Sequence, residues 1–200
     1  MTPGSRLSRA AVAAAVLAWT ARTGRPLTVG NGFLAREVAA AGDGPHVFYL
    51  LAGMGLAPAV AAGLARATGR PAAALEGDGN HLMGLPGTAT IALSGLAVTH
   101  VVHWNGGWES TGGQRLLRPG SVTDVGAALG YAWSTRVCTE DGLRAALARA
   151  ETAGGPVLIH AAGAMGEPPA PRTALSMPDN ARRLRDWMTQ TFVDRSSVKI

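Results

Sequence analysis

The sequence predicts an α/β fold: a three-layer sandwich in which a mostly parallel sheet carries helices on both faces. Two observations support this. Short apolar runs typical of buried strands alternate with helical patterns from residue 27 to residue 160. Glycine-rich segments follow three of those runs, at residues 52–55, 77–80 and 105–114. Parallel sheets bind ligands at the carboxyl ends of their strands, so these segments indicate a binding site.

Composition restricts the class of protein. The chain has 200 residues, of which 47% are hydrophobic and 16% charged, as expected for one globular domain over residues 1–200. The net charge of +5 comes from scattered arginines with no run longer than Arg182-Arg183, which argues against a nucleic-acid-binding surface. A positive surface instead favours anionic substrates or an acidic partner subunit.

Compartment and membrane signals point to the cytoplasm. The single Cys138 excludes an internal disulfide and suits a reducing compartment. There is no apolar run of about 18 residues that could span a membrane. The segment from Arg6 to Arg22 has the basic flanks of a signal peptide, but its core is rich in alanine and only weakly apolar. We interpret it as a first helix.

The elements of the first half follow in order. The alanine-rich helix over 5–23 ends at Gly24-Arg25-Pro26. Apolar runs predict strands at 27–29, 46–51 and 72–76. Helical patterns over 33–41 and 57–68 separate them.

The second half begins with a predicted helix over 81–93, whose first turn tolerates Pro86. A strand is predicted over 97–104, with successive side chains on opposite faces of the sheet. It leads into a polar, mobile loop over 108–117. Helices are then predicted over 121–129 and 140–150, the second capped by Thr139, with strands over 131–137 and 157–160. A proline-rich arm from about 163 leads to a last helix over 178–192.

Two strand ends supply hard oxygen ligands. Gly77-Asp78-Gly79 follows the strand over 72–76, and Asn105 follows the strand over 97–104. The carboxylate and the amide oxygen are expected to converge at one sheet edge, beside glycine backbone that a ligand can approach closely. Such ligands suit Mg²⁺, which completes its coordination with phosphates and water.

This pattern resembles the diphosphate-binding (PP) domain of thiamine-diphosphate enzymes, whose motif is Gly-Asp-Gly followed by an Asn a little under thirty residues later. Here the step is 105 − 78 = 27. The resemblance implies a magnesium ion held by the Asp78 carboxylate, the Asn105 side-chain oxygen and the Gly107 backbone oxygen. It implies cofactor contacts from Ala52, Gly53, Met54, Gly77, Asp78, Gly79, Asn80, Asn105, Gly107 and Trp108.

Met54 has a specific implied role. By the same resemblance, the Ala52 carbonyl and the Met54 N–H face the aminopyrimidine, and the Met54 side chain holds the cofactor bent. A flexible thioether suits a gap between two rings, and a methionine that merely fills the core at a helix entry is the alternative. His81 and His103 are candidates for contacting phosphate or substrate, with a packing role as the alternative for both.

Within the family, the likeness is greatest to phosphonopyruvate and sulfopyruvate decarboxylases, whose sequence after the Asn is much like that of Glu109 to Gln114 here. Glu109, Ser110, Thr111 and Gln114 are therefore candidates for facing the substrate or a partner subunit. Three positions depart from the family pattern: Trp104, Asn80 and Arg115. The first two departures leave the metal ligands intact, whereas the third leaves the identity of the substrate open.

Full-length members also carry a pyrimidine-binding (PYR) domain with a Glu that activates the cofactor. The resemblance therefore implies a separate PYR subunit, in a heterodimer or larger heteromer that decarboxylates a small anionic 2-oxo acid. A carboligase of the acyloin or acetolactate type is an alternative, as is a non-catalytic regulatory subunit. From another class, Gly30-x-Gly32-x-x-Ala35 matches the dinucleotide fingerprint of an oxidoreductase, but no acidic residue follows about twenty positions on.

Overall fold

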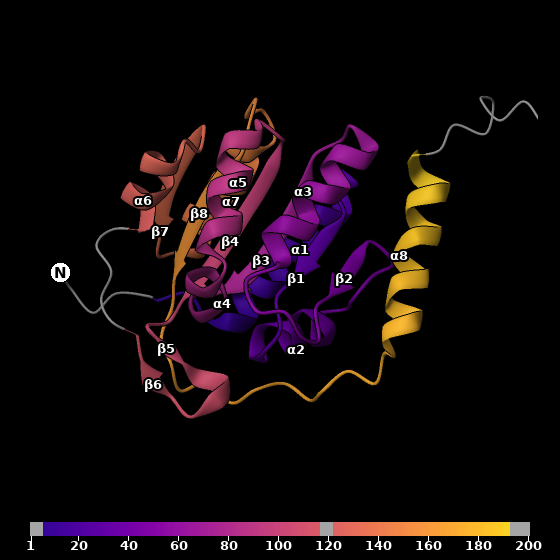
Figure 1. Cartoon of the computed structure of the whole chain (residues 1–200). Helices are drawn as coiled ribbons and strands as arrows, with labels where there is room; N and C mark the ends of the chain where they lie inside the picture. Colours follow the sequence, from indigo (N-terminus) through magenta and orange to yellow (C-terminus); the bar gives the residue numbers. More distant parts are fainter. Residues whose placement is uncertain (1–5, 117–121, 193–200) are drawn as a thin grey trace, which may run out of the picture.

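The computed structural model describes residues 6–116 and 122–192 and contains a six-stranded parallel sheet (Figure 1). The strand order is β2-β1-β3-β4-β8-β7. The strands are β1 (Leu27–Val29), β2 (Val47–Tyr49), β3 (Ala72–Gly77), β4 (Val98–Trp104), β7 (Trp133–Val137) and β8 (Val157–Ala162). Helices cover both faces of this sheet (Figure 1), which confirms the predicted three-layer α/β class.

The two layers are built from different helices. One face packs against α1 (Arg9–Thr23), α2 (Phe33–Ala40) and α7 (Glu140–Ala150) through the larger apolar core. The other face packs against α3 (Ala57–Thr68), α5 (Leu85–Ser94) and α6 (Val122–Leu129). Alternate residues of β4 face the two cores, with Val101 in the first and Val98 in the second. No described helix is both long enough and apolar enough to cross a bilayer.

Local chemistry sets several helix boundaries. The segment that resembles a signal peptide is helical, as predicted, and it begins after Ser8, whose hydroxyl accepts a hydrogen bond from the Ala11 amide. Ser5 lies outside the described residues. Helix α1 ends at Gly24, which adopts a left-handed conformation. Thr139 caps α7 by accepting from the Gly142 amide, as the sequence indicated.

The predicted helix over 81–93 is wrong in its extent. The structure has two helices there, α4 (Asp78–Met83) and α5, which meet at Gly84. The backbones of Gly84 and Gly55 touch, because a Cβ built on Gly84 would lie 2.3 Å from the Gly55 carbonyl oxygen. The close contact leaves no room for a side chain at the junction, which a periodicity argument cannot detect.

The segment predicted as a mobile loop contains short regular elements. A two-stranded antiparallel hairpin joins β5 (Gly107–Trp108) to β6 (Gln114–Arg115), with the 3₁₀ turn η1 (Glu109–Thr111) between them. Leu117 and Ser121, where the sequence placed the loop end and a helix start, lie outside the described residues.

The last helix, α8 (Met177–Phe192), lies beside the edge strand β2 (Figure 1). The Asn180 amide donates to the Tyr49 carbonyl at 2.8 Å, and its Oδ1 accepts from the Tyr49 N–H at 3.2 Å. This side chain thus supplies the hydrogen bonds that a further strand would make with β2.

Candidate functional site

Asp78 and Asn105 follow neighbouring strands and lie on one cavity. Strands β3 and β4 pair in parallel with Gly77 opposite His103, so the residues after both strands emerge at the same edge. The Gly106 N–H donates to Asp78 Oδ2 at 2.6 Å. The predicted convergence of the two strand ends is therefore present in the structure.

Asp78 is a buried carboxylate held by backbone amides. Its other oxygen, Oδ1, accepts from the Gly79 N–H at 2.9 Å. Burial raises the pKa of Asp78, while the amides of residues 79 and 105–107 act in the opposite direction. A cation beside Asp78 would stabilise the ionised form that this burial disfavours.

The orientation of the Asn105 amide is set by its neighbours. Its Nδ2 donates to Glu109 Oε2 at 3.0 Å, and its Oδ1 accepts from the Gly107 N–H at 3.0 Å. Glu109 is held by Arg9, whose Nη1 lies 2.6 Å from Oε2, and by the Gly166 N–H, 2.6 Å from Oε1. This chain of contacts fixes the Asn105 oxygen on the side of Gly107.

Most of the predicted site residues line a single cavity of about 110 Å³. They are Met54, Gly77, Asp78, Gly79, Asn80, His103, Asn105, Gly107, Trp108, Glu109, Ser110 and Thr111. Ala52, Gly53 and Gln114 are exposed and do not belong to this lining. A Cβ on Gly79 would lie 2.7 Å from the Trp108 ring, so glycine is needed where that ring covers the cavity.

Sequence reasoning missed part of this lining. Asn31, Gly32, Phe33 and Leu34, at the start of α2, border the same cavity as Asp78, as does Arg9 from α1. The sequence Gly30-x-Gly32-x-x-Ala35 did draw attention to the start of α2, but as a dinucleotide-binding site. No local signal marked Arg9, because its partner Glu109 is 100 residues away.

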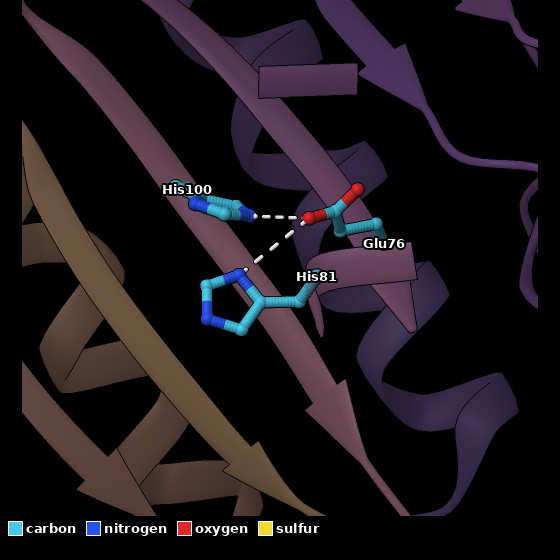
Figure 2. A group of neighbouring side chains, drawn as sticks. All are labelled: Glu76, His81 and His100. Atoms are coloured by element: carbon cyan, nitrogen blue, oxygen red, sulfur yellow. Dashed lines mark hydrogen bonds and ion pairs between the residues drawn. The ribbon is translucent and has the colours of Figure 1, made fainter. Parts of the chain in front are cut away.

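The two candidate histidines occupy different environments. His103 borders the cavity, where its Nε2 donates to the Leu7 carbonyl at 3.3 Å, and burial lowers its pKa. His81 is not part of the cavity lining. It belongs to α4 and lies in a buried group with Glu76 and His100, where its Nδ1 is 3.7 Å from Glu76 Oε1 (Figure 2).

Electrostatics in that buried group favour an ionised Glu76 and a neutral His81. Desolvation pushes the pKa of Glu76 up, but the neighbouring imidazoles of His100 and His81 outweigh it and hold this pKa below its ordinary value. Burial lowers the pKa of His81. His100 Nε2 lies 3.0 Å from Glu76 Oε1.

The cavity fits a magnesium-bound diphosphate in its chemistry. Its donors are the Asp78 carboxylate, the Asn105 amide oxygen and backbone groups of Gly107, which are oxygen ligands of the kind that Mg²⁺ prefers. Asn80 Oδ1 is buried without a hydrogen-bond partner, while Asn80 Nδ2 donates to the Asn31 carbonyl at 3.2 Å. An orphaned buried oxygen indicates a place where a further donor or cation is accommodated.

Comparison with known proteins identifies the family of the chain. The family model of the C-terminal TPP-binding domain of thiamine pyrophosphate enzymes matches residues 32–161. The chain is 35% identical over 169 residues to a phosphonopyruvate decarboxylase of Streptomyces hygroscopicus, covering 81% of this chain and 41% of that protein. It is 43% identical over 61 residues to the sulfopyruvate decarboxylase subunit beta of Methanothermobacter thermautotrophicus, covering 30% of this chain and 33% of the subunit.

Solved structures share the fold at low identity. Benzoylformate decarboxylase from Polynucleobacter necessarius superposes with a TM-score of 0.70 at 20% identity, over 84% of this chain and 35% of that one. A 4-hydroxybenzoylformate decarboxylase of Rhodococcus jostii gives 0.66 at 19% identity, over 84% and 34%. The chain thus spans about two fifths of the phosphonopyruvate decarboxylase that it matches. With its family model matched over most of the sheet and the Asp78 edge included, the chain belongs to the thiamine pyrophosphate enzymes as a C-terminal TPP-binding domain.

Proposed function

We propose that this chain is the diphosphate- and Mg²⁺-binding subunit of a two-chain thiamine-diphosphate-dependent 2-oxo-acid decarboxylase, with residues 1–200 as its PP domain. The observation that carries the proposal is the placement of Asp78 and Asn105 on one cavity after neighbouring parallel strands. In this proposal Mg²⁺ is held by the Asp78 carboxylate, Asn105 Oδ1 and the Gly107 carbonyl oxygen. Ligands of this kind leave positions free for two phosphate oxygens and water.

The residues of this chain bind and orient in this proposal. Asn80, Gly79 and Trp108 border the diphosphate, and Met54 lies against the cofactor rings. Bound thiamine diphosphate supplies the electron sink that accepts the electron pair released when carbon dioxide leaves a 2-oxo acid. The buried walls of the cavity exclude water from the reacting carbon.

We further propose that the PYR domain, with the acid that activates the cofactor, resides on a separate chain. The name of the sulfopyruvate decarboxylase relative, subunit beta, supports this division. The phosphonopyruvate and sulfopyruvate decarboxylase relatives also support a substrate with a second anionic group. The net charge of +5 suits such a substrate.

Glu109 is the weakest of the proposed substrate contacts, because Arg9, Asn105 and Gly166 already engage both of its oxygens. Ser110 and Thr111 remain the better candidates. A carboligase would use the same cavity, and product analysis of the complete enzyme separates the two reactions.

The proposal is tested with Asp78→Ala in the complex of this chain with the subunit that copurifies with it. Titration calorimetry with thiamine diphosphate is expected to show Mg²⁺-dependent binding in the wild type and none in the variant, because the only charged metal ligand is lost. Asp179→Ala, at an exposed acid on α8, is the matched control and should bind like the wild type. Unchanged cofactor affinity in Asp78→Ala, with an intact circular dichroism spectrum, would disprove the site.

A further inference from the structure

Glu76, His81 and His100 form a compact polar group outside the cofactor cavity. One ligand atom from each lies within 4.8 Å of the other two. All three side chains are at most 1% exposed. They come from β3, α4 and β4, and Figure 2 shows both imidazoles directed at the carboxylate. None of them lines the cavity that contains Asp78.

Two polar atoms of this group have no hydrogen-bond partner. They are Glu76 Oε2 and His81 Nδ1, and both are buried. A buried polar atom without a partner costs about 1–3 kcal/mol, and more when the group is charged. Two such atoms in one three-residue group indicate that the group is completed by a further atom.

The donor set and its spacing match a zinc-type ion. Two imidazole nitrogens and Glu76 Oε1 provide three donors of the types that bind Zn²⁺, which leaves one of its usual four positions for a bound water. With metal–ligand distances of about 2.0–2.1 Å, tetrahedral donors lie roughly 3.3 Å apart. The observed separations from Glu76 Oε1, 3.0 Å to His100 Nε2 and 3.7 Å to His81 Nδ1, lie on either side of that value.

The ring of His100 is also oriented as a metal ligand requires. Its Nδ1 lies 3.2 Å from the Tyr131 hydroxyl, which leaves Nε2 directed at Glu76. Metal-binding histidines almost always have such a hydrogen bond at the second ring nitrogen, because it fixes the ring. Imidazole ligands also distinguish this group from the oxygen-only donors around Asp78, since Mg²⁺ rarely binds histidine.

We propose that Glu76, His81 and His100 bind one Zn²⁺ ion that links β3, β4 and α4 directly beneath the cofactor edge. The ion replaces the proton that Glu76 and His100 otherwise share. It is a structural ion, because all three side chains are buried and none of them lines the cavity that contains Asp78. It is bound as the sheet and α4 assemble, so metal binding contributes to folding.

The test uses the full chain carrying Cys138→Ser, which removes the exposed thiol as a competing ligand. The protein is stripped with a chelator and titrated with Co²⁺ alone. We expect one equivalent to produce the visible bands of four-coordinate Co²⁺, and an excess of Zn²⁺ to abolish them. At about a hundredfold excess over its Kd, Zn²⁺ should raise the Tm by roughly 5–10 °C.

Four further substitutions identify the ligands. Glu76→Gln and His100→Gln should each abolish the bands, whereas His160→Gln, at another buried histidine, should leave them unchanged. Asp78→Asn should also keep them, which separates this site from the proposed magnesium site. Absence of bands in the parent protein, or bands that survive in Glu76→Gln and vanish in Asp78→Asn, would overturn the proposal. A Zn²⁺ content that follows Asp78 and not Glu76 would do the same.

Discussion

At the scale of single residues, Arg9 is the cation that connects the site to the rest of the chain. It is 2% exposed, and its guanidinium contacts Glu37 Oε1 at 3.3 Å and Glu109 Oε2 at 2.6 Å. It also donates to the Glu167 and Pro168 carbonyls. One side chain thereby joins α1, α2, the β5–β6 hairpin and the segment after β8.

Loss of Arg9 is expected to be costly. Arg9→Met keeps the length of the side chain but leaves two partly or fully buried carboxylates unpaired, so we predict a loss of about 3–5 kcal/mol in the free energy of unfolding. Arg144→Met is the matched control, because Arg144 pairs with two acids on an exposed helix face. That change should leave the free energy of unfolding nearly unchanged, because exposed ion pairs contribute little to stability. Urea denaturation that gave similar losses for both variants would contradict this account.

His160 is expected to make stability depend on pH. Both ring nitrogens are buried without partners, and burial lowers the pKa of His160 to about 4. Above pH 6.5 the residue is neutral whether the protein is folded or unfolded. As the pH falls from about 6.5 to 4, His160 binds a proton in the unfolded chain but stays neutral in the folded chain. The free energy of unfolding therefore falls by roughly 3 kcal/mol over that window.

His160→Leu should remove that part of the acid sensitivity and leave stability at pH 7 equal or slightly higher, because two unsatisfied nitrogens are replaced by carbon. Urea denaturation from pH 7.5 to pH 4.5 measures both effects. Other buried histidines with lowered pKa values, such as His46 and His103, contribute the same pH dependence of stability to the wild type and the variant. Wild-type and variant curves with the same pH slope would show that His160 is not responsible.

How far the sequence predicts individual residues depends on how far apart their partners are in the chain. Asp78 and Asn105 were predictable, because each directly follows a strand and parallel strands share an edge. The role of Glu109 as a partner of Arg9 was not, since that contact spans 100 residues and leaves no periodic pattern. Buried ion pairs of this kind depend on the packing of several elements at once.

At the scale of elements, the contact between Gly55 and Gly84 joins the start of α3 to the junction of α4 and α5. A Cβ on Gly55 would lie 2.4 Å from the Gly84 nitrogen, and Gly55 has a φ of +78°. This contact brings the turn that contains Met54 against the helix that begins at Asp78. Both segments line the cavity, and this contact holds them together.

Gly84→Ala should therefore disturb the site as well as the fold. Its Cβ would lie 2.3 Å from backbone that cannot move without shifting α3, so we predict a loss of about 2–3 kcal/mol or more in unfolding free energy. Gly87→Ala, one turn further along α5, is the control. It meets nothing within 4 Å and should gain up to about 1 kcal/mol from helix propensity. Guanidinium denaturation of both variants gives the comparison, and a neutral Gly84→Ala would show that the two backbones are not tightly packed.

The elements themselves were largely predictable, since strands and helices alternate with clear glycine and proline boundaries. The errors occur where tertiary contacts override local pattern. The run over 81–93 was predicted as one helix, but it is divided at Gly84, whose backbone touches that of Gly55. The β5–β6 hairpin is too short, at two residues a strand, for a sequence pattern to indicate.

At the scale of the whole molecule, exposed apolar side chains gather near the cofactor edge. Leu51 and Leu56, on either side of Met54, are 57% and 51% exposed, and Met83, next to the Gly55–Gly84 contact, is 57% exposed. Apolar groups beside an open cavity are typical of interfaces. If the PYR domain is a separate chain, these side chains belong to the surface that it covers.

Leu56→Asp is therefore expected to weaken association with the copurifying subunit while leaving this chain folded. Burial of one leucine contributes about 1.5–3 kcal/mol, so the Kd should rise at least about tenfold. Leu93→Asp is the matched control, because Leu93 is 81% exposed at the end of α5 that precedes β4, opposite the cofactor edge. Sedimentation velocity of the mixed chains measures both. A larger effect from Leu93→Asp would move the interface to the other end of the sheet, where the partner could not reach a cofactor bound at Asp78.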